Sequence, residues 1–320
     1  MKRLVYLSVL FLIGLASCNQ EVVFPDYKTQ NVYFAYQYPV RTITLGDDAF
    51  VNTDLDNAKK CQIYATLGGV YESRSDLAIQ VSVDKTLLKN GMLFGAGRDE
   101  VLAMPDSYYS LASNKIIIPK GTLAGGVDVQ LTDAFFADPK SIKNTYVIPM
   151  AITQSDVNAI PALAGKNFVL YAIKYINPWH GNYLRRGNDV VTGAVSRTVV
   201  RHAQFVENDE VNKLTTKSLT ELEFPVVLKD KDNKNVNVNL LMKFDNDGKC
   251  TVSSLTSGVT ASGSGAFVKK GEKNSWGSKD RDALYLKYEV NVAGMKVATT
   301  DTLVMRDRTV AFETFSPVAK

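Results

Sequence analysis

Hydrophobic and polar residues alternate along most of the chain with a period of two, which is typical of β-strands with one buried and one wet face. In GVDVQL (126–131) the Val and Leu side chains fall on one face and the Asp and Gln side chains on the other. Seven more strands are expected in the first half: NVYFAY (31–36), RTITL (41–45), CQIYATLGG (61–69), LAIQVSVD (77–84), KIIIPKG (115–121), YVIPMAIT (146–153) and NFVLYAIKY (167–175). Eight short strands separated by Gly, Pro, Asn and Asp turns predict a β-sandwich.

Local signals add detail to this half. The segment QYP after the first strand predicts a hairpin or a bend. VDKTLLKNGM (83–92) is the single helical segment expected, with Asp84 as its N-cap and its end before Gly91. Pro119 and Pro149 lie inside strand-like runs. Because proline has no N–H to donate to a β-ladder, we expect both at sheet edges or bulges.

The second half also shows alternating runs, joined by shorter polar turns. DNDGK (245–249) and VAGMK (292–296) are strong hairpin signals. A sequential meander of this kind predicts an up-and-down barrel or a curved sheet, because closure removes exposed strand edges. The expected fold class is therefore all-β, with a sandwich domain at residues 31–175 and a barrel-like domain at residues 176–320.

The N-terminus carries an export signal. Lys2 and Arg3 precede an apolar run, residues 5–15, that is too short to span a bilayer comfortably. The following Leu-Ala-Ser-Cys resembles the lipobox of bacterial lipoproteins, which implies a signal peptide at residues 1–17, acylation of Cys18 and a tether at 18–30. An ordinary secretory signal with an incidental cysteine is the alternative. Asn19, in place of an inner-membrane retention aspartate, favours the outer membrane, and the side that the protein faces stays open.

Charge and cysteine content exclude several classes of function. The formal net charge is +4, and removal of the signal peptide takes away two positive charges. The basic patch of a nucleic-acid-binding protein is therefore missing. Cys61 and Cys250 are expected to be buried small hydrophobes and not a disulfide. DNDG (245–248) and DKDNKN (230–235) fit hairpin turns better than calcium loops, and too few His and Cys residues remain for zinc, so we expect no metal and no cofactor.

One stretch of the first half resembles a known family. MPDSYYSLASNKIIIPKGTLAGGVDVQL (104–131) and NTYVIPMAIT (144–153) contain Pro-x-x-Tyr, I-P-x-G and Y-x-x-P-M-x-I in that order. In this it is similar to the N-terminal domain of a Bacteroidetes outer-membrane lipoprotein family of unknown function, over roughly residues 24–175. The resemblance implies an Ig-like sandwich followed by a lipocalin-like barrel. It also implies a glycan-related setting, since similar modules occur in glycan-capture lipoproteins and in some glycosidases.

Catalytic motifs are missing from the sequence. There is no G-x-S-x-G elbow, and SGSGAF (262–267) is expected to be a flexible turn that enters a strand. No pair of carboxylates stands out for glycoside hydrolysis. The expectation is therefore that the protein is not an enzyme.

Sugar binding asks for an aromatic ring with planar hydrogen-bonding groups around it, and two segments offer this. NPWHGNYLRRG (177–187) lies at the domain junction, and KNSWGSKDRD (273–282) forms a loop between strands. The candidate ligand-binding residues are Trp179, His180, Tyr183, Arg185, Asn274, Trp276 and Arg281. For each tryptophan the alternative is burial as a plug at the end of the barrel.

The arginines have simpler interpretations. Arg185 and Arg186 should point to opposite faces of a strand, one toward a carboxylate at the domain interface and the other into solvent. VMRDR (304–308) is expected to form local ion pairs of little net worth.

The expected function is that of a non-catalytic, lipid-anchored envelope protein that binds glycan. The setting implied is a polysaccharide-utilisation system, with an outer-membrane transport complex as a partner and the membrane contacted only through the lipid. A structural or adhesive module that docks to a partner protein is the alternative, and a glycoside hydrolase is the third hypothesis.

Overall fold

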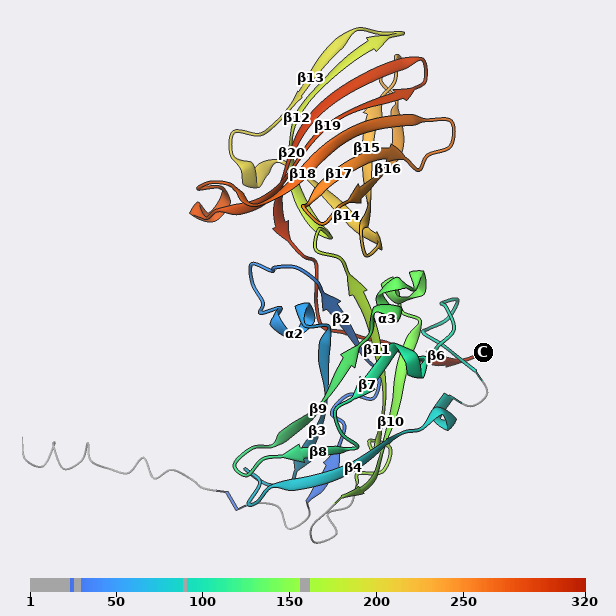
Figure 1. Cartoon of the computed structure of the whole chain (residues 1–320), viewed down its shortest axis with the longest axis vertical. Coiled ribbons are helices and arrows are strands. Elements are labelled where there is room, and N and C mark those ends of the chain that lie inside the picture. The colour runs from blue at the N-terminus through green and yellow to red at the C-terminus, as the bar shows by residue number, and fades with distance from the viewer. Residues whose placement is uncertain (1–23, 26–29, 89–90, 156–161) are drawn as a thin grey trace, which may run out of the picture.

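The computed structural model describes residues 24–25, 30–88, 91–155 and 162–320. It contains two all-β bodies placed end to end, with the first domain in the lower half of Figure 1 and the barrel in the upper half. The expected all-β class, a sandwich followed by a lipocalin-like barrel, is confirmed. Cys18 lies outside the described residues, so its lipidation stays a prediction. Within the described residues no helix is both long and apolar enough to cross a membrane.

Two sheets form the first domain. The smaller has the order β1 (Asn31–Tyr33), β3 (Lys60–Gly68), β9 (Ala124–Leu131) and β7 (Tyr109–Leu111). The larger has the order β21 (Glu313–Thr314), β2 (Pro39–Thr44), β11 (Phe168–Ile176), β10 (Tyr146–Ser155), β4 (Leu77–Val83) and β8 (Lys115–Ile118). All eight strands expected from the alternation are present. Their inward side chains, such as Ile63 and Ile173, are 1% exposed and form one core.

Short elements connect these strands. QYP is a bend and not a hairpin turn, because β1 and β2 lie in different sheets. The 3₁₀ turn η1 (Lys85–Leu88) follows Asp84, whose Oδ1 accepts a hydrogen bond of 2.9 Å from the backbone N of Thr86, as an N-cap should. The local pattern did not predict four other short helices: α2 (Asp54–Asn57), η2 (Asp106–Tyr108), α3 (Asp133–Ala137) and η3 (Pro139–Ile142).

The two prolines differ in their positions. Pro119 directly follows β8, an edge strand, as predicted. The prediction for Pro149 is wrong, because β10 lies in the interior of its sheet, between β11 and β4. On one side Pro149 pairs with β11. On the other side β10 pairs with β6 (Leu102–Ala103) before the proline and with β4 after it. Pro149 therefore lies between the end of one neighbouring strand and the start of the next, where its missing N–H interrupts neither ladder.

The second domain is a closed meander of eight strands. They are β12 (Gly181–Gly193), β14 (Glu210–Ser218), β15 (Glu221–Lys229), β16 (Asn235–Phe244), β17 (Lys249–Ser254), β18 (Thr260–Glu272), β19 (Arg281–Val292) and β20 (Met295–Asp307). β12 pairs with β20 along its length and closes the barrel, and β13 (Arg197–Arg201) extends the sheet beside β12. Two 3₁₀ turns, η4 (Val206–Asn208) and η5 (Trp276–Ser278), lie in its loops. Both predicted hairpins are present, with Gly248 and Gly294 at positive φ.

SGSGAF is not a flexible turn, which corrects the sequence interpretation. It lies inside β18, paired with β17 and β19. A Cβ on Gly265 would come 2.4 Å from both Leu286 Cδ2 and the backbone O of Tyr285. Glycine is therefore required there by close packing against β19, and not by a need for flexibility.

A charged network fills part of the barrel interior. The Arg185 side chain is 2% exposed and donates from Nε to Asp301 at 3.0 Å, and Arg201 bridges Asp301 and Asp189. Arg186, on the opposite face, pairs with Asp209 at 2.6 Å. The opposite-face prediction is thus confirmed. The predicted roles are wrong, because neither arginine reaches the domain interface and neither is left to solvent alone.

The chain does not end in the barrel, contrary to the expected domain 176–320. After β20 it returns to the first domain, where β21 pairs with β2 and β22 (Val318–Ala319) pairs with β5 (Met92–Leu93). Figure 1 shows the C-terminus beside the lower domain. Free backbone groups on β2 and β5 make these pairings available, and nothing in the local alternation indicates them.

Candidate functional site

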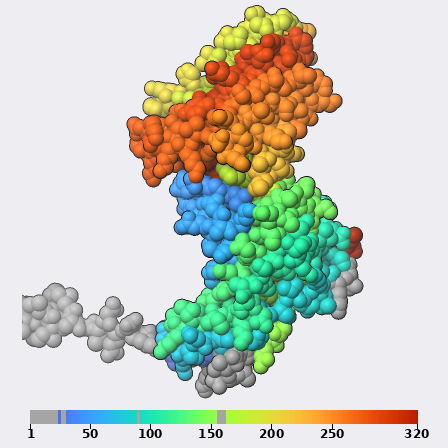
Figure 2. Space-filling view, in the orientation of Figure 1, coloured from blue at the N-terminus to red at the C-terminus, as the bar shows by residue number. Residues whose placement is uncertain are grey.

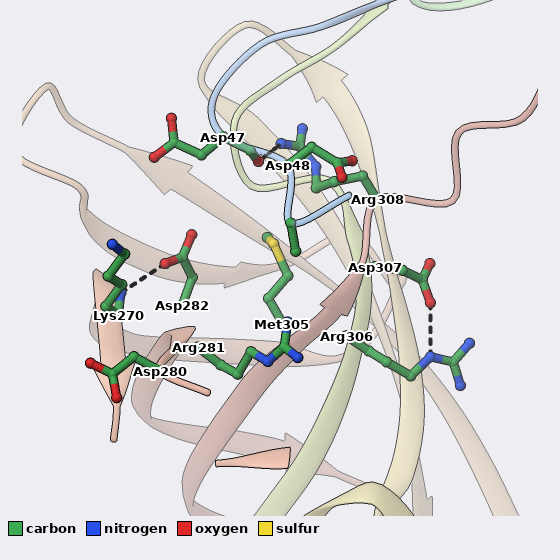
Figure 3. A pocket seen from close by; sticks show the side chains of 11 residues that line it. Asp47, Asp48, Lys270, Asp280, Arg281, Asp282, Met305, Arg306, Asp307 and Arg308 are labelled. Carbon is green, nitrogen blue, oxygen red and sulfur yellow. Dashed lines mark hydrogen bonds and ion pairs between the residues drawn. The ribbon is translucent and has the colours of Figure 1, made fainter. Parts of the chain in front are cut away.

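A small pocket lies where the two domains meet. Three segments surround it: the loop after β2, the connection from β18 to β19, and the end of β20 (Figure 3). Figure 2 shows the loop after β2, in blue, against the orange strands of the barrel. The cavity measures about 160 Å³ and is lined by Asp47, Asp48, Ala49, Lys270, Asp280, Arg281, Asp282, Met305, Arg306, Asp307 and Arg308.

Arg308 holds the upper wall of this junction pocket together. Its side chain is 2% exposed and donates to four backbone carbonyl oxygens: Leu45 (2.9 Å), Asp47 (2.9 Å), Asn177 (2.7 Å) and His180 (2.7 Å). Two of these belong to the first domain and two to the segment that leads into the barrel. Burial lowers the pKa of the Arg308 guanidinium from its ordinary value. The expectation of a weak local ion pair at this position is therefore wrong.

The aspartates of the pocket are already engaged. Each of the five accepts a hydrogen bond from a lysine or arginine side chain or from a backbone N–H: Asp47 from Lys269 (2.8 Å), Asp280 from Lys273 (2.9 Å), Asp307 from Arg306 (2.8 Å), Asp282 from the N of Lys270 (2.7 Å) and Asp48 from the N of Phe50 (2.7 Å). The acidic and basic side chains that line the pocket are thus nearly balanced in charge.

Arg281 extends toward the middle of the pocket, beside Met305 (Figure 3). It is 9% exposed, and its Nε donates to the backbone O of Trp276 at 3.2 Å. Its guanidinium carbon lies 3.3 Å from the centroid of the Trp276 ring, and Trp276 Nε1 donates to the O of Met305 at 3.2 Å. Burial lowers the pKa of Arg281. Asn274, at φ 45°, belongs to the tight turn of the same loop.

Three other candidates, Trp179, His180 and Tyr183, lie together at the end of the barrel that faces the junction. Trp179 stacks on Phe244, with ring centroids 4.0 Å apart, and Tyr183 is fully buried with its hydroxyl donating to the O of Trp179 at 2.7 Å. His180 Nδ1 accepts from the N of Thr216 at 3.1 Å, and burial lowers its pKa to about 4. These contacts favour the alternative of a barrel plug for Trp179.

Of the seven candidate residues, only Arg281 lines the pocket. Trp276 supports it from one side, Asn274 lies in the adjoining turn, and Arg185 is inside the barrel. Among the described residues, no cluster of His, Cys, Asp or Glu could hold a metal ion. Sequence reasoning missed the contributions of Asp47, Asp48 and Arg308. The dense charges of VMRDR, directly after the last barrel strand, were the one local signal for the last of these.

Two family models match the chain. A domain of unknown function, DUF5627, matches residues 178–309, and a model described as an N-terminal domain matches residues 27–159. No curated protein matches.

Three solved structures are similar to the chain. A Bacteroides ovatus protein of unknown function is 45% identical, with a TM-score of 0.85, and the match covers 92% of this chain and 100% of that one. An auxiliary nutrient binding protein from Bacteroides thetaiotaomicron is 17% identical (TM-score 0.37, 83% and 90% covered). A candidate carbohydrate-binding protein from B. ovatus is 13% identical (TM-score 0.31, 90% and 99% covered). The first similarity spans both domains, and the chain therefore belongs to the same two-domain family as the Bacteroides ovatus protein of unknown function.

Proposed function

We propose that the protein binds glycan, without chemistry, in the junction pocket. The observation that carries this proposal is a cavity built by both domains and bordered by charged side chains, into which the planar Arg281 guanidinium is held by Trp276. Sugars are recognised by planar hydrogen-bonding groups such as these. Pockets for drug-sized ligands measure about 300–1,000 Å³. A cavity of about 160 Å³ fits one terminal sugar unit better than a longer chain.

The state of the carboxylates supports binding over hydrolysis. A glycosidase needs one carboxylic acid that can give up a proton and a second carboxylate that stabilises the reacting sugar. In the pocket, Asp280 and Asp307 each pair with a cation, and the pKa of each carboxyl lies below its ordinary value. The hydrogen bond from Lys273 is the largest cause at Asp280. At Asp307, desolvation raises the pKa, but the contact with Arg306 and the hydrogen bonds to this carboxylate outweigh it. Such groups are poor proton donors.

The glycan proposal is tested with the chain from residue 19 to 320 on an array of host and plant glycans, followed by calorimetric titration. Ala49 is exposed at the rim of the pocket, so Ala49→Trp should fill the cavity without removing a side-chain contact. We expect this variant to lose at least tenfold in affinity. Ala112→Trp, at an exposed site on the first domain, is the matched control.

Two outcomes would count against this function. If the unaltered chain binds no glycan, the alternative of docking to a partner protein takes precedence. If Ala49→Trp binds as well as the unaltered chain, the glycan site lies elsewhere on the molecule.

We also propose that Cys18 is acylated and anchors the protein in the outer membrane, where it serves a glycan transport complex. The support is the lipobox-like Leu-Ala-Ser-Cys after a short apolar run. Cells fed labelled palmitate should label the unaltered protein and not the Cys18→Ser variant, and only the unaltered protein should sediment with outer membranes. Equal labelling of both would contradict the anchor.

A further inference from the structure

Arg281 differs from the other strongly buried arginines of the described chain in how its charge is compensated. Arg185 pairs with Asp301, and Arg308 donates to four carbonyl oxygens. Arg281 makes a single hydrogen bond, from Nε to Trp276 O, and has no carboxylate partner among the described residues. An arginine that has no carboxylate partner and faces a cavity is well placed to pair with an anion that enters it.

The two terminal nitrogens of Arg281 are available to donate hydrogen bonds to a bound anion. They have no hydrogen-bond partner in the described structure. They are also not among the fully buried polar atoms, so a ligand in the pocket can reach them. One face of the guanidinium is fixed against Trp276, which is itself held by its hydrogen bond to Met305. The fork is therefore oriented before any ligand arrives, which reduces the entropy lost on binding.

Neighbouring aspartates do not neutralise this charge. Asp280 and Asp282 flank Arg281 in sequence, yet one accepts from Lys273 and the other from the backbone N of Lys270. Asp307, across the pocket, accepts from Arg306. The local acids thus have their own donors, and the Arg281 fork remains for a group supplied from outside.

We infer that the junction pocket selects a terminal sugar that carries a carboxylate, held through two parallel hydrogen bonds from Nη1 and Nη2 of Arg281. The planar guanidinium matches a planar carboxylate in this bidentate arrangement, and charge-assisted bonds of this kind are the strong ones. This inference rests on the proposed function and names the ligand class of the same site. Trp276 is a positioning residue in this arrangement, because its own ring face is covered by the arginine.

The test is calorimetric titration of the chain from residue 19 to 320 with matched sugars. Methyl glucuronide and methyl galacturonide carry the carboxylate, the corresponding methyl glucoside and galactoside lack it, and a 6-sulfated glucoside carries a tetrahedral anion instead. We expect at least tenfold tighter binding of the uronides than of their neutral counterparts, with an affinity that weakens as salt rises. The sulfated sugar should bind more weakly than the uronides.

Variants then assign the preference to one side chain. Arg281→Gln should abolish the discrimination between acidic and neutral sugars, and Arg281→Lys should retain only part of it. Lys296→Gln, which removes a cation paired with Glu289 outside the pocket, is the control and should leave the discrimination intact. Thermal unfolding of each variant shows whether the fold is retained. Trp276→Phe keeps a ring beneath the guanidinium and provides a second, milder perturbation.

The outcomes separate this inference from the glycan proposal. Neutral sugars that bind as well as uronides and are blocked by Ala49→Trp would overturn the acidic ligand and keep the glycan site. A simple carboxylate such as acetate that binds through Arg281 while every sugar fails would keep the anion site and overturn the glycan function. Discrimination that survives Arg281→Gln in a folded variant would remove this residue from the site.

Discussion

His180 shows how a single buried side chain makes stability depend on pH. Its Nδ1 must stay unprotonated to accept the hydrogen bond from Thr216, and burial together with the charge of Arg308 lowers its pKa from 6.5 to about 4. Between these values the unfolded chain binds more protons than the folded one. The contribution of His180 to stability is therefore complete above about pH 6.5 and is lost as the pH falls toward 4.

We predict that the free energy of unfolding falls by up to about 1.4 kcal/mol for each pH unit between 6.5 and 4 because of this histidine. His180→Asn keeps an acceptor in a similar place without the titration, so it should flatten that part of the profile. Urea unfolding at a series of pH values measures the difference between the two proteins. His202→Asn, at an exposed histidine, is the control. Parallel profiles for His180→Asn and the unaltered chain would contradict the prediction.

At the scale of residues, the sequence predicted the side-chain orientations that follow from the alternation along a strand. The opposite orientations of Arg185 and Arg186 follow from the period of a strand, and the structure has them. The role of Arg308 could not be predicted, because its four acceptors come from positions 45 to 180, far away in the chain. Likewise, nothing in the loop around Trp276 reveals that an arginine covers its ring.

At the scale of elements, the strands were predicted well because buried and exposed side chains alternate from one residue to the next along each strand. The pairing of the C-terminal tail was not predicted. β21 and β22 have two residues each, which is too short to show the alternation of hydrophobic and polar residues. Their positions depend on tertiary packing. Phe315 is 7% exposed and contacts Tyr38 and Phe94, with ring centroids 5.4 Å and 4.6 Å apart.

This aromatic cluster predicts that the tail stabilises the first domain. Phe315→Ala should lower the free energy of unfolding by about 3 kcal/mol, because a buried aromatic ring is replaced by a cavity. Phe312→Ala removes a ring that is 69% exposed three residues earlier and should cost less than about 1 kcal/mol. Urea denaturation of both variants, followed by far-UV circular dichroism, provides the comparison. Equal costs would show that the tail is only loosely attached.

At the scale of the whole molecule, the chain crosses the junction twice, since the first domain contains residues before and after the barrel. Side chains lock the two crossings to each other. Asn177, fully buried, donates to the O atoms of Ser218 and Glu221 at 2.9 Å each, and Arg308 joins the outgoing and returning segments. The junction pocket therefore depends on a fixed relation between the domains, and we expect them to unfold together.

Arg308 is the side chain on which this coupling should depend most. Arg308→Ala removes one hydrogen bond from each of four carbonyl oxygens and should lower the free energy of unfolding by about 3 kcal/mol. Arg306→Ala, which removes a partly exposed pair with its neighbour Asp307, should cost less than about 1 kcal/mol.

Two spectroscopic signals can distinguish a loss of coupling from a general loss of stability. Both tryptophans, Trp179 and Trp276, belong to the barrel side of the junction, so their fluorescence follows the barrel, while far-UV circular dichroism follows both domains. In the unaltered chain the two urea midpoints should coincide. In Arg308→Ala they should separate, because each domain then unfolds at its own denaturant concentration. Midpoints that shift together would show that other contacts suffice to couple the domains, and that Arg308 contributes stability alone.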